Sequence, residues 1–340
     1  MEKKSYDLID VFKLVGALLI FAMHMSAFGS FGENVQFYGL QLLSRWGVPF
    51  YFIISSFFLF GKSKNGNITG EQLCHYIKRI FYLYAVWFVI NLPSIFYIRL
   101  WGADLTSVRT WLYFIRNSLI SSTFTGSWYL MSCMFSSFLI YILSKKLSTK
   151  TILAITFLIH IFCALTSAYK GLFPSVTLFI YRHLFGMANS IVTGSFYFAI
   201  GKYIAENRER LSRIPTSRSV IMIVLFYMLY YIEIIVLKRL EILGTTDVAF
   251  ALLPLAFFMA VLCINRSCSI KYTKLFRKIS IIVYCSQSTV MLAASLVRKI
   301  LGFEHSLIRF VIGCVIMAVC VCTVLFLQKK TKFKWVQYLT

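Results

Sequence analysis

The chain has 340 residues, of which 59% are hydrophobic and only 14% are charged, and its mean hydropathy is +0.77. These values exclude an ordinary soluble domain, in which charged residues make up about 25%. The formal net charge of +23 could indicate a nucleic-acid partner, but the charge is spread over short connections between apolar runs. We therefore expect an integral membrane protein with the lipid bilayer as its partner and no nucleic-acid partner.

Ten apolar segments are long enough, or nearly so, to cross about 30 Å of hydrocarbon. We predict an all-α, polytopic membrane helical bundle that forms one integral domain over residues 1–340. Lys and Arg are about twice as abundant on one alternating set of connections as on the other, which places both termini in the cytoplasm by the positive-inside rule. The predicted spans are 8–28, 38–60, 80–98, 128–143, 152–168, 184–204, 220–237, 248–264, 279–297 and 307–327.

The first predicted span contains two ionisable residues, Lys13 and His24. Such side chains are costly in a membrane and indicate function by default. Their spacing places them within roughly 20° of one helix face and about 16 Å apart along the axis. A neutral imidazole with one free nitrogen suits a general base, although a buried histidine that donates to a neighbouring carbonyl is also common. We therefore predict His24 as a catalytic candidate.

Lys78 and Arg79 form a second basic group, at the inner end of the third predicted span. Alone, the pair is typical of positive-inside anchoring. Together with Lys13 at the same predicted depth, it could bind phosphate oxygens through charge-assisted hydrogen bonds.

On the opposite side, Arg45 precedes Pro49 near the end of the second predicted span. Its guanidinium could snorkel to the headgroups or satisfy carbonyls that the proline frees. Trp128 and Arg182 stand at span ends, where interfacial anchors are common, although Arg182 could bind an anionic or hydroxylated acceptor. The long connection 99–127 mixes aromatic residues with arginine, so we expect it in the membrane interface, where it could cap a cavity.

The remaining polar residues give weaker signals. The nine cysteines form no CxxC pair and lie mostly in predicted spans, so we expect packing roles and no metal site. Glu233 lies inside a late predicted span, where it could pair with Lys238 or Arg239. The charged connection 202–218 is expected to be a solvated helical hairpin.

Taken together, these residues resemble the acyltransferase-3 family of bacterial multi-pass membrane O-acyltransferases, and the resemblance runs through most of the chain. Three positions depart from the family pattern: Lys13 replaces an arginine, Tyr76 replaces the first arginine of an Arg-x-x-Arg pair, and Gln287 stands where a late motif has histidine. The matching segments are DVFKLVGALLIFAMH, which holds Asp10, Lys13 and His24, then RWGVPFYFIISSFFLF from Arg45, KRI from Lys78, GSWYL from Gly126 and RHLFGMANS from Arg182.

The resemblance implies a membrane O-acyltransferase in the bacterial inner membrane. It would move an acyl group, expected to be acetyl, from cytoplasmic acyl-CoA to a hydroxyl of a cell-surface or lipid-linked saccharide. Acyl-CoA is then a donor substrate, and no permanently bound cofactor is expected. The predicted site comprises His24 as the catalytic residue, Lys13, Lys78 and Arg79 as donor-binding residues, and Arg45, Trp128 and Arg182 as acceptor-binding residues.

Two other classes of function remain open. The first is a transporter or flippase of a sugar or other small solute, with His24 as a proton relay. The second is a catalytically inactive membrane sensor or scaffold, which the changes at Tyr76 and Gln287 keep open. Thioester consumption in the presence of acceptor distinguishes an enzyme from both.

Overall fold

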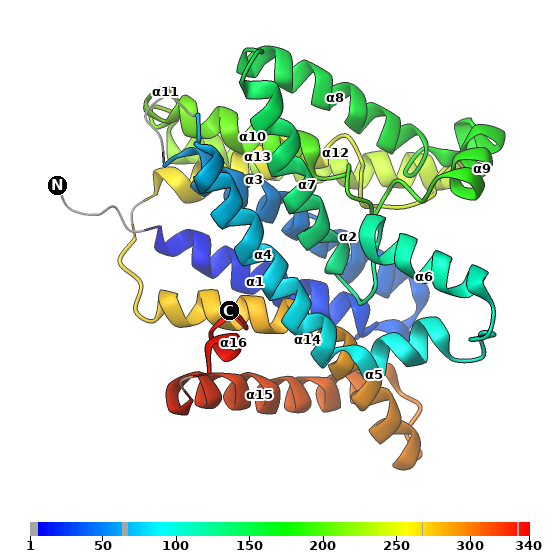
Figure 1. Ribbon diagram of the computed structural model, residues 1–340. Helices are drawn as coiled ribbons and strands as arrows, with labels where there is room; N and C mark the ends of the chain where they lie inside the picture. The colour runs from blue at the N-terminus through cyan, green and yellow to red at the C-terminus, as the bar shows by residue number, and fades with distance from the viewer. Residues whose placement is uncertain (1–5, 63–66, 267, 332) are drawn as a thin grey trace. The chain divides into compact units, whose positions relative to one another are not determined.

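The computed structural model in Figure 1 describes residues 6–62, 67–266, 268–331 and 333–340. Among the residues that the structure describes, 76% are helical and none lies in a strand, which confirms the all-α prediction. The chain divides into two compact units. Unit 1 comprises Met1–Ile9, Val48–Lys78 and Trp128–Ile270, and unit 2 comprises Asp10–Gly47, Arg79–Ser127 and Lys271–Thr340.

The helices that lie mainly in unit 1 come from the middle of the chain. They are α3 (Gly47–Phe60), α7 (Ser127–Ser144), α8 (Thr149–Leu165), η4 (Lys170–Leu172), α9 (Pro174–His183), α10 (Ser195–Glu206), α11 (Arg208–Leu211), α12 (Thr216–Arg239) and α13 (Leu252–Asn265).

Those that lie mainly in unit 2 come from both ends of the chain and from the segment before α7. They are α1 (Asp7–His24), η1 (Gly29–Phe31), η2 (Val35–Gln41), α2 (Leu42–Ser44), α5 (Leu92–Ile95), η3 (Phe96–Leu100), α6 (Val108–Ile120), α14 (Thr273–Ile300), α15 (Ser306–Lys330) and α16 (Lys334–Gln337). Helix α4 (Gly70–Ile90) contributes its first half to unit 1 and its second half to unit 2.

Six helices of the described chain are long and apolar enough to cross a membrane. Two further apolar helices, α8 and α13, are shorter. The count of ten spans and the cytoplasmic side of the termini stay predictions, and residues 1–5 lie outside the described part. The six candidates are Val35–Phe60, Gly70–Ile90, Ser127–Ser144, Thr216–Arg239, Thr273–Ile300 and Ser306–Lys330.

The predicted span 184–204 is helical only in its second half, because α10 begins at Ser195. In the first half, the Thr193 hydroxyl donates to the Met187 carbonyl at 2.6 Å and the Ser190 hydroxyl donates to it at 3.0 Å. Side chains that bond local carbonyls compete with helical hydrogen bonding. The third predicted span also shifts: α4 begins ten residues early, at Gly70, and ends at Ile90, before Pro93.

In unit 1, α10 packs very closely against α3. A Cβ atom on Gly201 would lie 2.3 Å from the Ile53 carbonyl oxygen, so only glycine fits. The Ser56 hydroxyl donates to the Phe198 carbonyl at 2.5 Å across the same contact. Small residues and interhelical hydrogen bonds of this kind hold membrane helices together. The neighbouring Lys202 is 1% exposed and pairs with Glu206 at 2.6 Å, so this part of the predicted solvated hairpin is buried.

Glu233 of α12 connects three segments of unit 1. One carboxylate oxygen accepts from the Tyr169 hydroxyl at 2.5 Å and from the Phe250 amide at 2.7 Å. The other accepts from the Ala251 amide at 2.8 Å. These amides precede α13, where helix N-termini leave N–H groups unpaired and favour negative charge. Glu233 therefore caps α13, in place of the predicted pairing with Lys238 or Arg239.

Helices α14 and α15 lie side by side in unit 2 (Figure 1). With α1 they bury an apolar cluster that includes Phe21, Met25, Val290 and Met317. Asn91, which is fully buried after α4, joins this layer: its amide donates to the Cys285 carbonyl at 3.0 Å, and its oxygen accepts from the Thr289 hydroxyl at 2.9 Å. In unit 2, the part of α1 from Asp10 onward thus packs against α14 and α15.

The first prediction tests the Glu233 cap. Glu233→Ala should lower the free energy of unfolding by about 1.5–3 kcal/mol, because three donors lose a charged acceptor. Thermal unfolding of the detergent-solubilised chain, followed by tryptophan fluorescence, measures the change. Glu209→Ala, which removes an exposed carboxylate of the same unit, is the control; equal midpoints for the two variants would contradict the capping role.

Candidate functional site

Lys13 and His24 both lie on α1, as predicted, and both side chains are half-buried. His24 is the last residue of the helix, next to Met25, which is buried in the apolar cluster. Ala17, about two helical turns before His24, also belongs to that cluster, so the imidazole lies at the edge of the buried stripe.

A hydrogen-bonded turn at residues 25–27 caps the C-terminal end of α1. The Ala27 amide donates to the Ala22 carbonyl at 3.1 Å, and the Ser26 amide donates to the Met23 carbonyl at 3.0 Å. This pair of bonds is a Schellman motif, whose turn residue is usually glycine. Here Ser26 adopts φ 50°, a left-handed conformation that is uncommon for a residue with a side chain. The backbone on the C-terminal side of His24 is therefore held in one strained conformation.

The first turn of α15 fixes this cap from outside α1. The Arg309 guanidinium donates to the Met25 carbonyl. Ser306 and Ser30 exchange hydrogen bonds of 2.7 and 2.8 Å, each backbone amide donating to the other hydroxyl. Nothing in the sequence near Arg309 indicates a partner at the end of the first helix.

Arg298 and Arg309 give this end of unit 2 a positive character. The charge of Arg298 acts on Arg309, and the Nε atoms of both are buried without a hydrogen-bond partner. One N–H group of the Arg298 guanidinium donates to the Glu304 carbonyl at 2.8 Å. Buried guanidinium donors without a partner favour a nearby anionic group.

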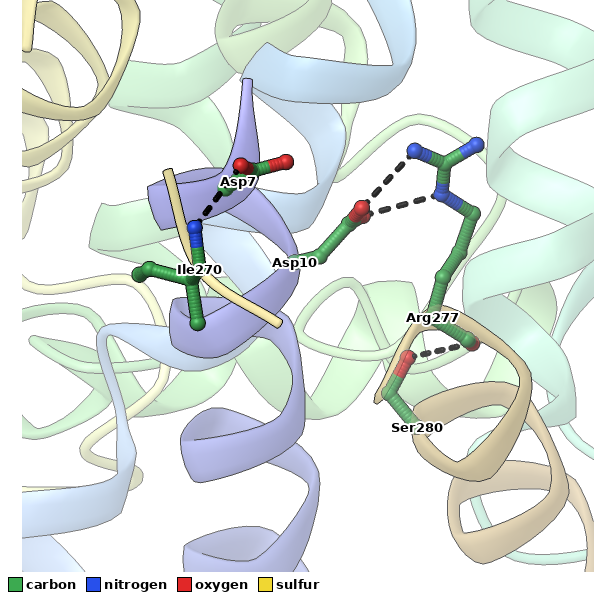
Figure 2. A network of polar contacts seen from close by, with 5 residues as sticks. All are labelled: Asp7, Asp10, Ile270, Arg277 and Ser280. Carbon is green, nitrogen blue, oxygen red and sulfur yellow. Dashed lines mark hydrogen bonds and ion pairs between the residues drawn. The ribbon is translucent and has the colours of Figure 1, made fainter. Parts of the chain in front are cut away.

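Near the start of α1, two aspartates anchor the helix (Figure 2). In unit 2, Asp10 is buried and accepts two bonds from the Arg277 guanidinium, at 2.9 and 2.7 Å. In unit 1, the Asp7 carboxylate accepts from the Ile270 amide at 3.1 Å. Bidentate guanidinium–carboxylate pairs fix direction as well as distance. Asp10 belongs to the segment that carries the resemblance, and the structure gives it an orienting role one helical turn from Lys13.

The other predicted donor-binding residues lie on α4. Lys78 and Arg79 are both exposed, and they sit about two helical turns inside α4 rather than before it, because the helix begins at Gly70. Tyr76 is half-buried, and its hydroxyl lies 2.7 Å from the Ser55 hydroxyl oxygen. The side chain that replaces a family arginine thus packs within unit 1.

The three predicted acceptor-binding residues differ in exposure. Arg45 is half-buried at the end of α2 in unit 2. In unit 1, Trp128 is half-buried and packs on Phe52, with ring centroids 5.8 Å apart, whereas Arg182 is exposed in the last turn of α9. The two compact units therefore divide the predicted residues: Lys13, His24, Arg45 and Arg79 belong to unit 2, and Lys78, Trp128 and Arg182 belong to unit 1.

Gln287, which stands at a family histidine position, is fully buried on α14. Its amide nitrogen donates to the Tyr284 carbonyl at 2.9 Å, and its amide oxygen is buried without a partner. The Tyr284 hydroxyl donates to the Gly126 carbonyl at 3.1 Å. Gly126 has φ +85°, and a Cβ there would lie 2.9 Å from the Tyr284 ring, so the GSWYL segment requires glycine at this point. The late motif and the GSWYL segment thus share one hydrogen-bonded contact in unit 2.

The acyltransferase domain family matches residues 6–327, nearly the whole chain. The chain belongs to this family. The match confirms the resemblance drawn from the motifs, and it supports a membrane acyltransferase. Among the described residues, no group of three or more His, Cys, Asp or Glu side chains could hold a metal ion.

Two curated relatives of this acyltransferase-family chain come from Enterococcus faecalis, and both are named amino-acid racemase. They are 24% and 21% identical to it over 346 and 331 residues. The matches cover 98% and 95% of this chain but 47% and 46% of the relatives, so the chain spans about half the length of the curated relatives it matches. No solved structure matches the chain.

The second prediction tests the Asp10–Arg277 pair. Arg277→Ala should lower the free energy of unfolding by about 1.5–3 kcal/mol, because the Asp10 carboxylate, which is 3% exposed, loses its charged partner. Lys274→Ala, which removes an exposed cation of the same helix, should leave the thermal midpoint unchanged. A loss no larger than that of the control would show that Asp10 finds sufficient partners without Arg277.

Proposed function

We propose that this family member is an O-acyltransferase of the bacterial cell membrane. It moves an acyl group, which we propose to be acetyl, from cytoplasmic acyl-CoA to a hydroxyl of a cell-surface or lipid-linked saccharide. The observation that carries the proposal is the half-buried imidazole of His24, fixed at the end of α1 in a chain whose family match spans residues 6–327.

In the proposed reaction, a nitrogen of His24 accepts the proton of the acceptor hydroxyl. The hydroxyl oxygen attacks the thioester carbonyl carbon, an ester bond forms, and the carbon–sulfur bond breaks. The imidazolium then returns its proton to the leaving thiolate. A route in which His24 first carries the acyl group uses the same residue as nucleophile and stays open.

Lys13 and Arg79, which belong to unit 2, are proposed to bind the phosphates of the donor. Lys78, which belongs to unit 1, is proposed for the same role. All three side chains can donate charge-assisted hydrogen bonds to phosphate oxygens. Only the guanidinium of Arg79 can donate two parallel bonds at once. About 16 Å of helix separates Lys13 from His24. An extended pantetheine arm would follow this length of α1 and bring the thioester to the imidazole. Arg45, Trp128 and Arg182 are proposed to contact the acceptor.

Amino-acid racemisation is the second candidate function, because both curated relatives carry that name. Less than half of each relative is matched, so their activity can reside in the part that this chain does not cover. We expect the purified chain to consume acyl-CoA and to leave the enantiomer ratio of free amino acids unchanged. Racemisation without thioester consumption would favour the second candidate.

The third prediction tests the catalytic role. His24→Ala should accumulate in the membrane like the wild type, because alanine inserts more easily than imidazole, but acyl transfer should fall by at least about 100-fold. Thiol release from acetyl-CoA in the presence of a cell-surface polysaccharide fraction measures the rate. His305→Ala, which removes an exposed imidazole of the same unit, is the control. Near-normal transfer by His24→Ala would reject the catalytic role of His24, and no transfer by the wild type would leave transport or sensing.

The fourth prediction concerns the donor. Lys13→Ala and Arg79→Ala should each raise the KM for acyl-CoA about tenfold or more, with less change in kcat, because each removes a contact that binds substrate and transition state alike. Lys13→Arg should keep donor affinity. Lys274→Ala is the control for lost positive charge. Unchanged KM with reduced membrane abundance would identify both residues as topological anchors.

A further inference from the structure

Unit 2 contains a cavity of about 230 Å³ beside α6. This volume is smaller than the roughly 300–1,000 Å³ of sites for drug-sized ligands, so it suits a ligand of one ring. None of the residues to which we have assigned a role in acyl transfer lines it. Its lining includes Arg99, Thr110, Tyr113, Phe114, Asn117 and Ser122.

Helix α6 presents two different faces. Val108, Leu112, Ile115 and Leu119 form an apolar stripe whose members are 52–72% exposed. The cavity-lining residues Thr110, Tyr113, Phe114 and Asn117 recur at the spacing that normally carries a buried apolar stripe, yet α6 buries none of its residues. The helix therefore turns hydroxyl, aromatic and amide groups toward a hollow, where a packed helix would place aliphatic side chains.

The lining groups are held in place by their neighbours. The Arg99 guanidinium donates to the Ser122 carbonyl at 3.0 Å. The guanidiniums of Arg109 and Arg116 lie 5.5 and 4.8 Å from the centre of the Tyr113 ring. Cation–π contacts of this kind fix the ring plane. The Tyr113 ring is thus oriented before any ligand arrives.

Two further polar groups lie on the same helix: Asn117, which lines the cavity, and Arg116, which does not. Arg116 donates to the Asn117 side-chain oxygen at 3.4 Å, and its Nε is buried without a hydrogen-bond partner. The Asn117 side chain offers both a donor and an acceptor.

We propose that this cavity binds one sugar ring of the saccharide acceptor. A sugar ring presents apolar C–H faces and a rim of hydroxyls that both donate and accept. The lining matches both features, with the Tyr113 and Phe114 rings beside the amide of Asn117, the hydroxyl of Thr110 and the guanidinium of Arg99. A small inorganic anion fits less well, because it needs neither aromatic faces nor hydrogen-bond acceptors.

This inference rests on the proposed acyltransferase function, which it extends by naming a binding subsite for the acceptor. The subsite would supply affinity for the acceptor apart from the chemical step. Variants of the cavity should therefore raise the KM for acceptor and leave the KM for acyl-CoA unchanged.

The test uses the full chain in nanodiscs prepared without sugar detergents, and saturation-transfer NMR with methyl α-D-glucoside, N-acetyl-D-glucosamine and D-glucuronate as probes. At least one probe should bind saturably to the wild type. Asn117→Ala and Thr110→Val should weaken that binding about fivefold to tenfold, since each loses a neutral hydrogen bond. Leu112→Ala, which changes only the exposed stripe, should bind like the wild type, and unchanged thermal midpoints show that the variants fold.

Absence of binding by all three probes, or equal binding by the wild type and both cavity variants, overturns the sugar subsite. His24→Ala separates the two proposals, because it should lose acyl transfer while it keeps sugar binding. Sugar binding without thioester consumption by the wild type would support the subsite and reject the acyltransferase proposal. Thioester consumption without sugar binding would do the reverse.

Discussion

Polar groups that leave water for hydrocarbon must find partners within the protein, because each unpaired one costs several kcal/mol. In this chain the constraint acts first on the backbone, which is helical through most of its apolar runs. It acts next on buried polar side chains, some of which form hydrogen bonds between helices. Asn91 does so in unit 2, with bonds to two residues of α14. Ser56 does so in unit 1, with its bond to α10.

The same constraint explains the environment of His24. The end of a helix exposes carbonyls, and α1 ends among apolar residues, so those carbonyls need partners from elsewhere. The Schellman motif satisfies part of the demand, and Arg309 satisfies the Met25 carbonyl. As these groups serve the backbone, the imidazole is left half-buried at a fixed point of the helix. A reactive side chain gains a defined position from the need to cap its own helix.

The sequence predicted well what depends on neighbouring residues. Continuous apolar periodicity located 128–143 and 307–327, which agree closely with α7 and α15. It failed at 184–194, where Ser190 and Thr193 hydroxyls bond a local carbonyl, because composition alone does not show where a side chain will compete with the helix. For the site, spacing correctly placed Lys13 and His24 on one helix. The partners of that helix, Arg277 and Arg309, lie 267 and 284 residues from the groups they bind, beyond the reach of any local pattern.

The cap made by Glu233 has a consequence for the order in which the chain is synthesised. The Tyr169 hydroxyl lies 64 residues before Glu233, so it is already present when α12 emerges from the ribosome. The amides of Phe250 and Ala251 follow 17 and 18 residues later, so they do not yet exist at that moment. At that early stage, the Tyr169 hydroxyl is the one of the three donors that is available to the Glu233 carboxylate. Membrane insertion of α12 and α13 as a pair, rather than one after the other, would shorten that stage.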